Sequence, residues 1–384
     1  MRPVARPVSG HFSVDVMTAW LDAVAHRLGT ENADLRNARG QVLAEDIRAA
    51  RSIPPLDRAA LDGFAVRADA SLGAGAYNPL ELLAVAVAAG DDLPEGMDAV
   101  VPVDRTEANS PGRIVVVEPV APGDNVELQG ATAPAGAALV PAGMRLAARH
   151  LGMLAQAGLT RLPVIRRPRV RLRLVKPAQP DGWTDSNGPM ILAAIERDGG
   201  VVDEPIAVGR SQVAIRDALV NVDSDLVLVA GGTGPGIDDH SAAALAEGGE
   251  LAIHGVALRP GETTGFGRTG DGVPVVLLPG TPAACLWSYE LFAGRAIRRL
   301  GGRDPGLPYR SREMTVARKI VSAIGMTEIC PVRCGAGDAV APLPSFAETG
   351  LMAAVAADGF VIVPEASEGY PQGARVTVYL YEGS

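Results

Sequence analysis

Aromatic residues are scarce in this sequence. Phe, Trp and Tyr make up 4% of its 384 residues, whereas 47% of the residues are hydrophobic. The interior of the folded chain must therefore be built mostly from Ala, Val and Leu, and there is enough apolar material for large cores. A chain of this length predicts two to four domains.

An excess of positive charge is also missing. The chain has 35 Lys and Arg residues against 44 Asp and Glu residues, which gives a formal net charge of −9 at pH 7. This balance argues against a nucleic-acid-binding protein, which would need a broad basic surface. It leaves open a small anionic ligand, because a local group of basic residues is sufficient to hold one.

No segment is apolar over a length that would span a membrane. The most apolar stretch, LELLAVAVAAG, is shorter than the roughly 20 residues that a spanning helix needs, and it contains Glu81. Arg2 and Arg6 near the N-terminus are not followed by the apolar segment of a signal peptide. We therefore predict a cytoplasmic protein with no membrane partner.

Cysteine is rare, with three residues at positions 285, 330 and 334. A small odd number argues against a secreted domain stabilised by disulfides. Cys330 and Cys334 form an isolated C-x3-C pair, whereas a zinc site needs about four ligands. We therefore interpret the two as ordinary thiols in a reducing compartment rather than as a zinc site.

Glycine and proline are abundant, with 45 and 30 residues respectively, and they separate many short elements. Residues 13–28 have the apolar spacing of a helix, with Ser13 as its N-cap and Gly29 as its end. Residues 80–142 and 312–384 consist of short apolar runs between turn signals, which predicts two small β units.

The segment that begins at residue 168 alternates strands and helices. PRVRLRLV, DLVLVAGG and VPVVLLPG are strand candidates, and the last two are apolar throughout, as in buried strands. DSNGPMILAAIERDGG is a helix candidate that Ser186 or Asn187 would cap and Gly199 would end. Apolar strands that alternate with helices predict a parallel α/β sheet.

Three loops rich in Gly, Pro, Asp or Asn follow these strands, at residues 176–187, 231–239 and 279–282. Open parallel sheets bind ligands at the carboxyl ends of their strands. Glycines there expose backbone N–H groups to an anion, and the following helix adds its dipole. One such loop would favour a plain tight turn, but three at one edge favour an anion site. The candidate residues are Ser186, Asn187, Gly231, Gly232, Gly234, Gly236, Pro279, Gly280 and Thr281.

Arg169, Arg171 and Arg173 alternate through the first of these strands. A buried parallel strand should be apolar on both faces, so one interpretation is an exposed strand face or a seam between domains. The other is that Arg173, near the carboxyl end of the strand, supplies positive charge to a bound anion.

Seven stretches, taken in chain order, resemble motifs of one known family. They are PPLDRAALDGFAVRA, LPEGMDAVVPVDRTE, DSNGPMILAAIERDGG, DLVLVAGGTGPGIDDHS, LRPGETTGFGR, LLPGTPAACLWSYELF and ETGLMAAVAADGFVIVPE. On these motifs the chain resembles the MoeA and gephyrin E-domain family, the molybdopterin molybdenumtransferases. The resemblance extends over nearly the whole chain.

The resemblance implies an α/β multidomain fold in a homodimer. Its parts would be an elongated N-terminal domain of helical and extended segments (1–66 and 143–167), a small β domain (67–142), a parallel α/β molybdopterin-binding domain (168–304) and a C-terminal β domain (305–384). It also implies a reaction in which molybdate is inserted into the dithiolene of adenylylated molybdopterin and AMP is released, with the help of Mg²⁺.

Matching the motifs residue by residue implies catalytic acids at Asp57, Asp62 and Asp239, with Asp239 as the metal ligand and Arg259 as a cofactor-binding residue. Asp57 and Asp62 flank the turn into GFAV, and a plain turn-forming role is the alternative for Asp62. The implied substrates are molybdopterin or molybdopterin-AMP together with molybdate.

The sequence departs from the family pattern at several site positions. A G-E-D-I turn reads GATA at residues 130–133, an I-x-R-D-D turn reads approximately VGRS at residues 208–211, Glu262 replaces a lysine and Thr281 replaces an asparagine. One remaining acid is a poor Mg²⁺ site. Two functions stay open: a molybdenumtransferase with a rearranged site, or a degenerate relative that binds a pterin, a nucleotide or another phosphorylated anion without Mg²⁺-dependent insertion. A scaffolding role, as in gephyrin, has no support in the composition.

Overall fold

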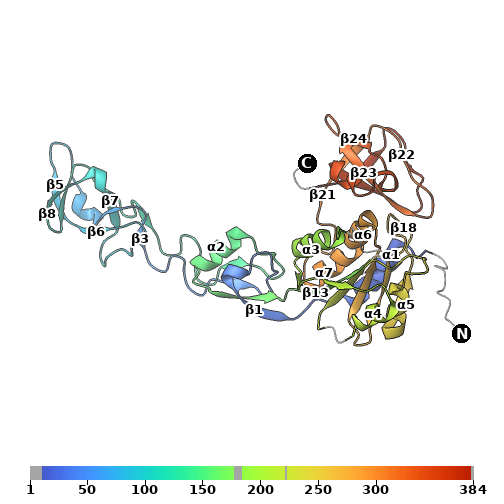
Figure 1. Ribbon diagram of the computed structural model, residues 1–384. Coiled ribbons are helices and arrows are strands. Elements are labelled where there is room, and N and C mark those ends of the chain that lie inside the picture. Colours follow the sequence, from blue (N-terminus) through green and yellow to red (C-terminus); the bar gives the residue numbers. More distant parts are fainter. Residues whose placement is uncertain (1–10, 177–183, 221–222, 382–384) are drawn as a thin grey trace. The chain divides into compact units, whose positions relative to one another are not determined.

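A computed structural model describes residues 11–176, 184–220 and 223–381 of the chain (Figure 1). The chain divides into two compact units, one formed by residues 1–30 and 165–384 and the other by residues 31–164. The four domains that the sequence predicts divide the chain more finely and stay a prediction.

The larger unit is built around a mixed sheet with a parallel centre. β16 (Leu226–Ala230) lies between β13 (Arg169–Val175) and β20 (Pro274–Leu278), and all three are parallel. β14 (Val201–Val202) and β15 (Ile206–Val208) also pair with β13 in parallel. The parallel α/β arrangement that the apolar runs predict is confirmed.

One edge of this sheet is antiparallel, which the sequence analysis did not predict. β19 (Gly265–Thr269) pairs in antiparallel fashion with β20 on one side and with β17 (Gly249–His254) on the other. A tight turn joins β19 to β20, with Gly272 at a φ of +85° and the Thr269 N–H donating to the Val273 carbonyl. A connection this short reverses the chain and therefore produces antiparallel pairing.

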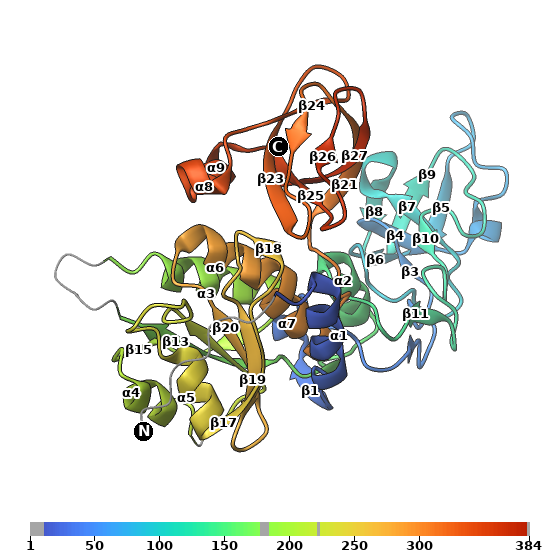
Figure 2. The ribbon, with the colours of Figure 1, turned by 90° about the vertical axis from the view of Figure 1, so that its right-hand side faces the viewer.

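Helices cover both faces of the sheet (Figure 2). One face packs on α1 (Val14–Val24), α3 (Asn187–Asp198), α6 (Pro282–Ser288) and α7 (Gly294–Leu300). The other face packs on α4 (Gln212–Asp217) and α5 (Ser241–Gly248).

Successive residues of β16 enter opposite cores. Leu226, Leu228 and Ala230 belong to the cluster on the α3 side, whereas Val227 and Val229 belong to the cluster on the α4 side. The strand is apolar without a break because helices cover it on both faces.

The first helix is confirmed in place but not in length. Ser13 caps α1 through its Oγ, which accepts the Val16 N–H at 3.3 Å. The predicted end at Gly29 is wrong, because α1 ends at Val24. Beyond it the chain turns onto α7, where the Leu28 N–H donates to the Leu300 carbonyl at 2.9 Å.

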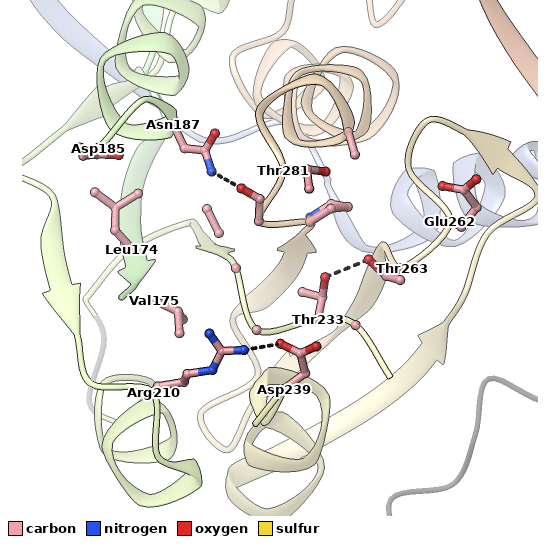
Figure 3. A pocket seen from close by; sticks show the side chains of 17 residues that line it. Leu174, Val175, Asp185, Asn187, Arg210, Thr233, Asp239, Glu262, Thr263 and Thr281 are labelled. Atoms are coloured by element: carbon pink, nitrogen blue, oxygen red, sulfur yellow. Dashed lines mark hydrogen bonds and ion pairs between the residues drawn. The ribbon is translucent and has the colours of Figure 1, made fainter. Parts of the chain in front are cut away.

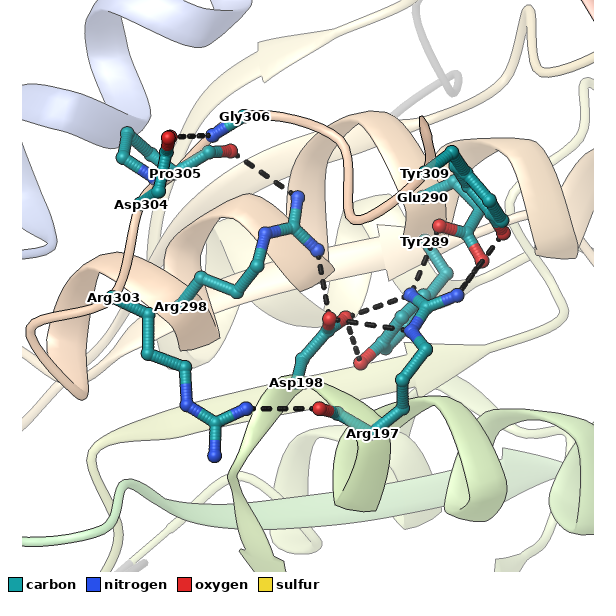
Figure 4. A network of polar contacts seen from close by, with 10 residues as sticks. All are labelled: Arg197, Asp198, Tyr289, Glu290, Arg298, Arg303, Asp304, Pro305, Gly306 and Tyr309. Atoms are coloured by element: carbon teal, nitrogen blue, oxygen red, sulfur yellow. Dashed lines mark hydrogen bonds and ion pairs between the residues drawn. The ribbon is translucent and has the colours of Figure 1, made fainter. Parts of the chain in front are cut away.

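A buried ionic network ties α3 to the helical segment that includes α7 (Figure 4). Arg197 pairs with Glu290 at 2.8 Å and with Asp198 at 2.9 Å, and Arg298 pairs with Asp198 at 2.9 Å. Arg197 also donates to the Tyr309 hydroxyl at 3.0 Å. The Asp198 and Glu290 side chains are 1% and 2% exposed, so removal of either partner would leave an uncompensated charge in the interior.

The C-terminal part of the larger unit is a small β unit, as the short apolar runs predict, and its strands close into a barrel. Its strands pair in a closed ring in the order β23 (Thr327–Cys334), β24 (Ala339–Pro342), β21 (Arg310–Val316), β27 (Arg375–Leu380) and β25 (Gly359–Val363).

One short strand links the α/β segment to the barrel, and further short elements belong to the barrel segment of the chain. β18 (Leu258–Arg259) leaves the α/β segment and pairs with β23 in parallel. β22 (Ile320–Val321) pairs with β26 (Gly369–Tyr370), and the short helices α8 (Phe346–Thr349) and α9 (Met352–Ala356) lie between β24 and β25 in the chain.

The unit of residues 31–164 consists mainly of short antiparallel strands. Two sheets have the orders β6–β4–β7 and β5–β9–β8. Their strands are β4 (Gly63–Val66), β5 (Leu80–Leu83), β6 (Val85–Val87), β7 (Ala99–Pro102), β8 (Glu107–Ser110) and β9 (Arg113–Val116). Two-stranded pairs add β1 (Thr30–Asp34) with β12 (Arg161–Ile165), β2 (Ile47–Arg48) with β11 (Ala138–Val140), and β3 (Arg58–Ala59) with β10 (Val126–Glu127). The helix α2 (Ala148–Gln156) ends before Gly158, whose φ is +81°.

Candidate functional site

A hollow of about 480 Å³ lies at the carboxyl ends of β13, β16 and β20 (Figure 3). Its walls include Asp185 and Asn187 at the start of α3, residues 231–234 after β16, and residues 279–281 after β20. The structure thus brings the three predicted loops to one hollow. Residues 177–183 of the first loop lie outside the described part of the chain.

The loop after β16 needs glycine for its backbone path. Gly231 and Gly232 have φ values of +102° and +65°, a region that residues with a Cβ rarely adopt. Ser241 at the start of α5 fixes this path, since its Oγ donates to the Gly231 carbonyl at 2.7 Å and its N–H donates to the Gly232 carbonyl at 2.9 Å. Among the described residues, no acceptor is found for the N–H groups of Gly232, Thr233 and Gly234, so these donors are available to a ligand.

Asp239 binds the backbone of the same loop and forms an ion pair with Arg210. Its Oδ2 accepts the Gly236 N–H at 3.1 Å, and a Cβ on Gly234 would come within 2.6 Å of the same oxygen. Arg210, between β15 and α4, donates from Nη2 to the Asp239 Oδ1 at 3.1 Å and from Nε to the Asp238 carbonyl at 2.9 Å. The arginine therefore fixes the carboxylate from the side of β15.

The beginning of α3 differs from the prediction in its capping residue. Ser186 makes no capping hydrogen bond, and the Gly188 N–H is instead bound by the Asp185 Oδ1 at 2.8 Å. Asn187 is turned across the hollow and donates from Nδ2 to the Gly280 carbonyl at 2.9 Å. The Asn187 Oδ1 is buried and has no hydrogen-bond partner among the described residues, so it can accept a donor from a ligand.

Thr263, just before β19, reaches the hollow from the antiparallel edge and meets Thr233 of the loop after β16. The Thr233 and Thr263 hydroxyl oxygens lie 2.9 Å apart, and the His254 Nε2 lies 2.9 Å from the Thr233 carbonyl oxygen. Thr233 lies within the predicted loop of residues 231–239, whereas Thr263 was not among the predicted site residues. His254 pairs with Gly265 at the start of β19, close to Thr263 in the chain.

Glu262 also lines the hollow, but its carboxylate already accepts two hydrogen bonds. The Gly261 N–H donates to its Oε2 at 3.1 Å, and Arg259 approaches its Oε1 at 3.4 Å. Arg259 itself is not among the lining residues.

The comparisons with known proteins agree with this architecture. Residues 12–158 match the family model of the MoeA N-terminal region (domains I and II), residues 173–299 that of a probable molybdopterin-binding domain, and residues 313–381 that of the MoeA C-terminal region (domain IV). Molybdopterin molybdenumtransferase 2 of Mycobacterium tuberculosis is 32% identical over 322 residues, which are 74% of this chain and 78% of the relative.

The chain belongs to the MoeA family. The molybdopterin molybdenumtransferase of a Nostoc species is 31% identical over 314 residues, which are 72% of this chain and 71% of the relative. The solved structure of the molybdopterin biosynthesis MoeA protein from Pyrococcus horikoshii matches with a TM-score of 0.74 at 27% identity, and it covers 98% of this chain and 100% of that one. The chain is thus a molybdopterin molybdenumtransferase-like protein of molybdenum cofactor biosynthesis.

Several predicted ligand-binding residues do not line the hollow of this MoeA-family chain. Ser186, Gly236 and Arg259 lie beside it rather than in its wall. Arg173 is 9% exposed, and its Nε donates to the Ala218 carbonyl at the end of α4 at 3.0 Å. Burial, with a smaller effect of Arg171, lowers the pKa of Arg173. We therefore do not include Arg173 among the residues that we propose to contact the ligand.

Asp57 and Asp62 belong to the unit of residues 31–164 and hold turns there. The Asp57 Oδ1 accepts the Gln129 N–H at 2.6 Å, and the Asp62 Oδ1 accepts the Ala89 N–H at 2.8 Å. These bonds account for both acids structurally, and their catalytic role remains a prediction from the family motif.

The residues around the hollow do not fit a Mg²⁺ ion held by the protein. Over residues 11–176, 184–220 and 223–381, no group of three or more His, Cys, Asp or Glu side chains is placed to hold a metal. Asp239, the predicted ligand, already binds Arg210 and the Gly236 N–H. A cation at Asp239 would lie beside the Arg210 guanidinium, whose positive charge would repel it, so we derive no step through Mg²⁺. None of the helices in the described ranges is long and apolar enough to cross a membrane.

Proposed function

We propose that this chain binds molybdopterin, free or adenylylated, in the hollow at the ends of β13, β16 and β20, and that it inserts molybdate with release of AMP. The observation that carries the proposal is the row of N–H groups at residues 232–234, for which the described part of the chain provides no acceptor. This loop lies inside the segment that matches the molybdopterin-binding family model.

The backbone would hold the anionic part of the ligand. The N–H groups of Gly232, Thr233 and Gly234 point from one short loop, and such loops bind phosphate and other oxyanions. Ser241 keeps them in place through its two bonds to the loop. Because the donors are fixed before the ligand arrives, little conformational entropy is lost on binding.

Asn187 would contact the pterin. Its buried Oδ1 is a free acceptor among the described residues, and its Nδ2 is tied to the Gly280 carbonyl. A pterin ring carries N–H donors that match such an acceptor. In this proposal the ring would lie toward α3 and the phosphate toward α5.

Family membership supports three further parts of the proposal. The chain would act as a homodimer in the cytoplasm, and Asp57 and Asp62 would contribute to the reaction as the family motif implies. The Pyrococcus horikoshii MoeA structure, which matches over 98% of this chain, supports the shared fold on which these parts depend.

The experiment is a turnover assay with purified protein, molybdopterin-AMP and molybdate. We expect release of AMP in step with the formation of cofactor that reconstitutes a molybdenum apoenzyme. Folded protein that releases no AMP above a blank would contradict the transferase proposal.

A second candidate is a family member that binds a phosphorylated ligand without inserting metal. The Arg210–Asp239 pair favours it, because it occupies the carboxylate that the family resemblance assigns to Mg²⁺. A calorimetric titration of the same protein with molybdopterin-AMP, run beside the turnover assay, separates the two: ligand binding without AMP release would support the second candidate.

A further inference from the structure

The charges around the hollow are unusual for a site that receives a phosphorylated ligand. Its described lining contains three carboxylates, of Asp185, Asp239 and Glu262, and one cationic side chain, that of Arg210. The Asp185 and Glu262 carboxylates each accept a backbone N–H, from Gly188 and Gly261 respectively. A phosphate that enters the hollow therefore meets few positive groups. Among the described lining residues, Arg210 is the one with a positively charged side chain.

Two of the three guanidinium nitrogens of Arg210 are hydrogen-bonded within the described part of the chain, and the third is available to a ligand. Nε and Nη2 bind the Asp238 carbonyl and the Asp239 carboxylate at 2.9 and 3.1 Å. Nη1 makes no hydrogen bond within the described residues. In Figure 3 the group lies between Val175 and Asp239, at the wall of the hollow. The Arg210 side chain is 31% exposed, so it is open to a ligand while its partner Asp239 is only 19% exposed.

We propose that Arg210 binds the phosphate of the ligand directly and takes the place of a divalent cation in this hollow. This inference rests on the proposed function only in that the ligand carries a phosphate. A guanidinium keeps its charge at every physiological pH and donates in a planar fork that suits phosphate oxygens. Asp239 then acts as a positioning residue, because it orients Arg210 instead of coordinating a metal.

The test is calorimetric titration of the intact chain with AMP, without molybdate and without turnover. We expect the same dissociation constant in EDTA and in excess MgCl₂. This arm uses the unmodified protein and does not depend on how any variant folds. A dissociation constant that rises about tenfold or more in EDTA would overturn the proposal, and so would the absence of AMP binding.

Arg210→Ala should weaken AMP binding by about tenfold or more, the usual effect of losing one charge-assisted hydrogen bond. Arg216→Ala is the matched control, because Arg216 lies on the neighbouring α4, pairs with Asp217 and Glu247, and does not line the hollow. Its dissociation constant should equal that of the parent. Equal losses in both variants, or none in Arg210→Ala, would contradict the proposal.

Arg210→Asp provides a converse test. It places a second carboxylate beside Asp239, and paired carboxylates with phosphate oxygens are the ligands that Mg²⁺ prefers. We expect AMP binding in this variant to become dependent on MgCl₂. Binding that stays as strong in EDTA as in the parent would refute the role of Arg210. Since no arm measures turnover, a chain that binds AMP through Arg210 but releases none from molybdopterin-AMP would refute only the transferase proposal.

Discussion

Gly232 allows a direct test of the claim that backbone N–H groups hold the ligand. Its φ is +65°, and a Cβ there would lie 2.9 Å from the Ser241 Oγ. Gly232→Ala therefore imposes about 1–2 kcal/mol of backbone strain and crowds the side chain that fixes the loop. We expect a similar loss in the free energy of unfolding, measured in urea. Because the loop must shift, we also expect AMP to bind about tenfold more weakly by calorimetry.

Gly272→Ala separates strain from ligand binding. Gly272 has a φ of +85° in the β19–β20 turn, and a Cβ there would meet nothing within 4 Å. This variant should lose a comparable free energy of unfolding while its affinity for AMP stays unchanged. Parental affinity in Gly232→Ala, or equal losses of affinity in both variants, would refute the assignment of these N–H groups to the ligand.

Three other predictions concern the larger unit. Glu290→Gln leaves the half-buried Arg197 guanidinium with Asp198 as its charged partner. It should lower the free energy of unfolding in urea by about 1–3 kcal/mol, the range for losing a hydrogen bond to a charged group; a loss within error would contradict the role of the network. The hydrogen bond from Arg295, opposed by partial burial, lowers the pKa of Asp22. A lowered carboxyl pKa stabilises the fold above the unfolded pKa of about 3.9, so the stability that Asp22→Asn loses at pH 7 should disappear as the pH falls through the lower folded pKa. A difference in stability that stays constant down to pH 2 would contradict this prediction. Burial raises the pKa of Cys330 to about 12, so iodoacetamide at pH 8 should alkylate it far more slowly than a cysteine in a short peptide, and an equal rate would contradict its burial.

The sheet was largely predictable because its strands carry their own signal. β16 is buried at every position and its run DLVLVA has no polar interruption after the first residue. The antiparallel edge was missed because β17 is mostly exposed or half-buried. β19 is mostly buried, but glycine breaks its apolar pattern at positions 265 and 267. A Cβ at Gly267 would overlap the Glu250 carbonyl oxygen, so the glycine that hides the strand from a pattern search is required by the close pairing.

Part of the hollow's lining was predictable from the sequence, namely the glycine loop together with Asn187, Asp239 and Thr281. Glycines 231, 232 and 234 follow a strand and are recognisable from that position alone. Arg210 could not be recognised in the same way, because its role depends on an ion pair with a residue 29 positions away. The two interpretations of Arg173 could not be separated from the sequence, because alternation along β13 does not tell which face meets the ligand; in the structure its side chain turns toward α4.

A crystal structure of the chain with molybdopterin-AMP would test the central claim most directly. We predict phosphate density in the hollow beside the N–H groups of residues 232–234 and the Arg210 Nη1, with Arg210 still paired to Asp239. Ligand density at another place on the chain, or a metal ion on Asp239 with Arg210 turned away, would contradict this account.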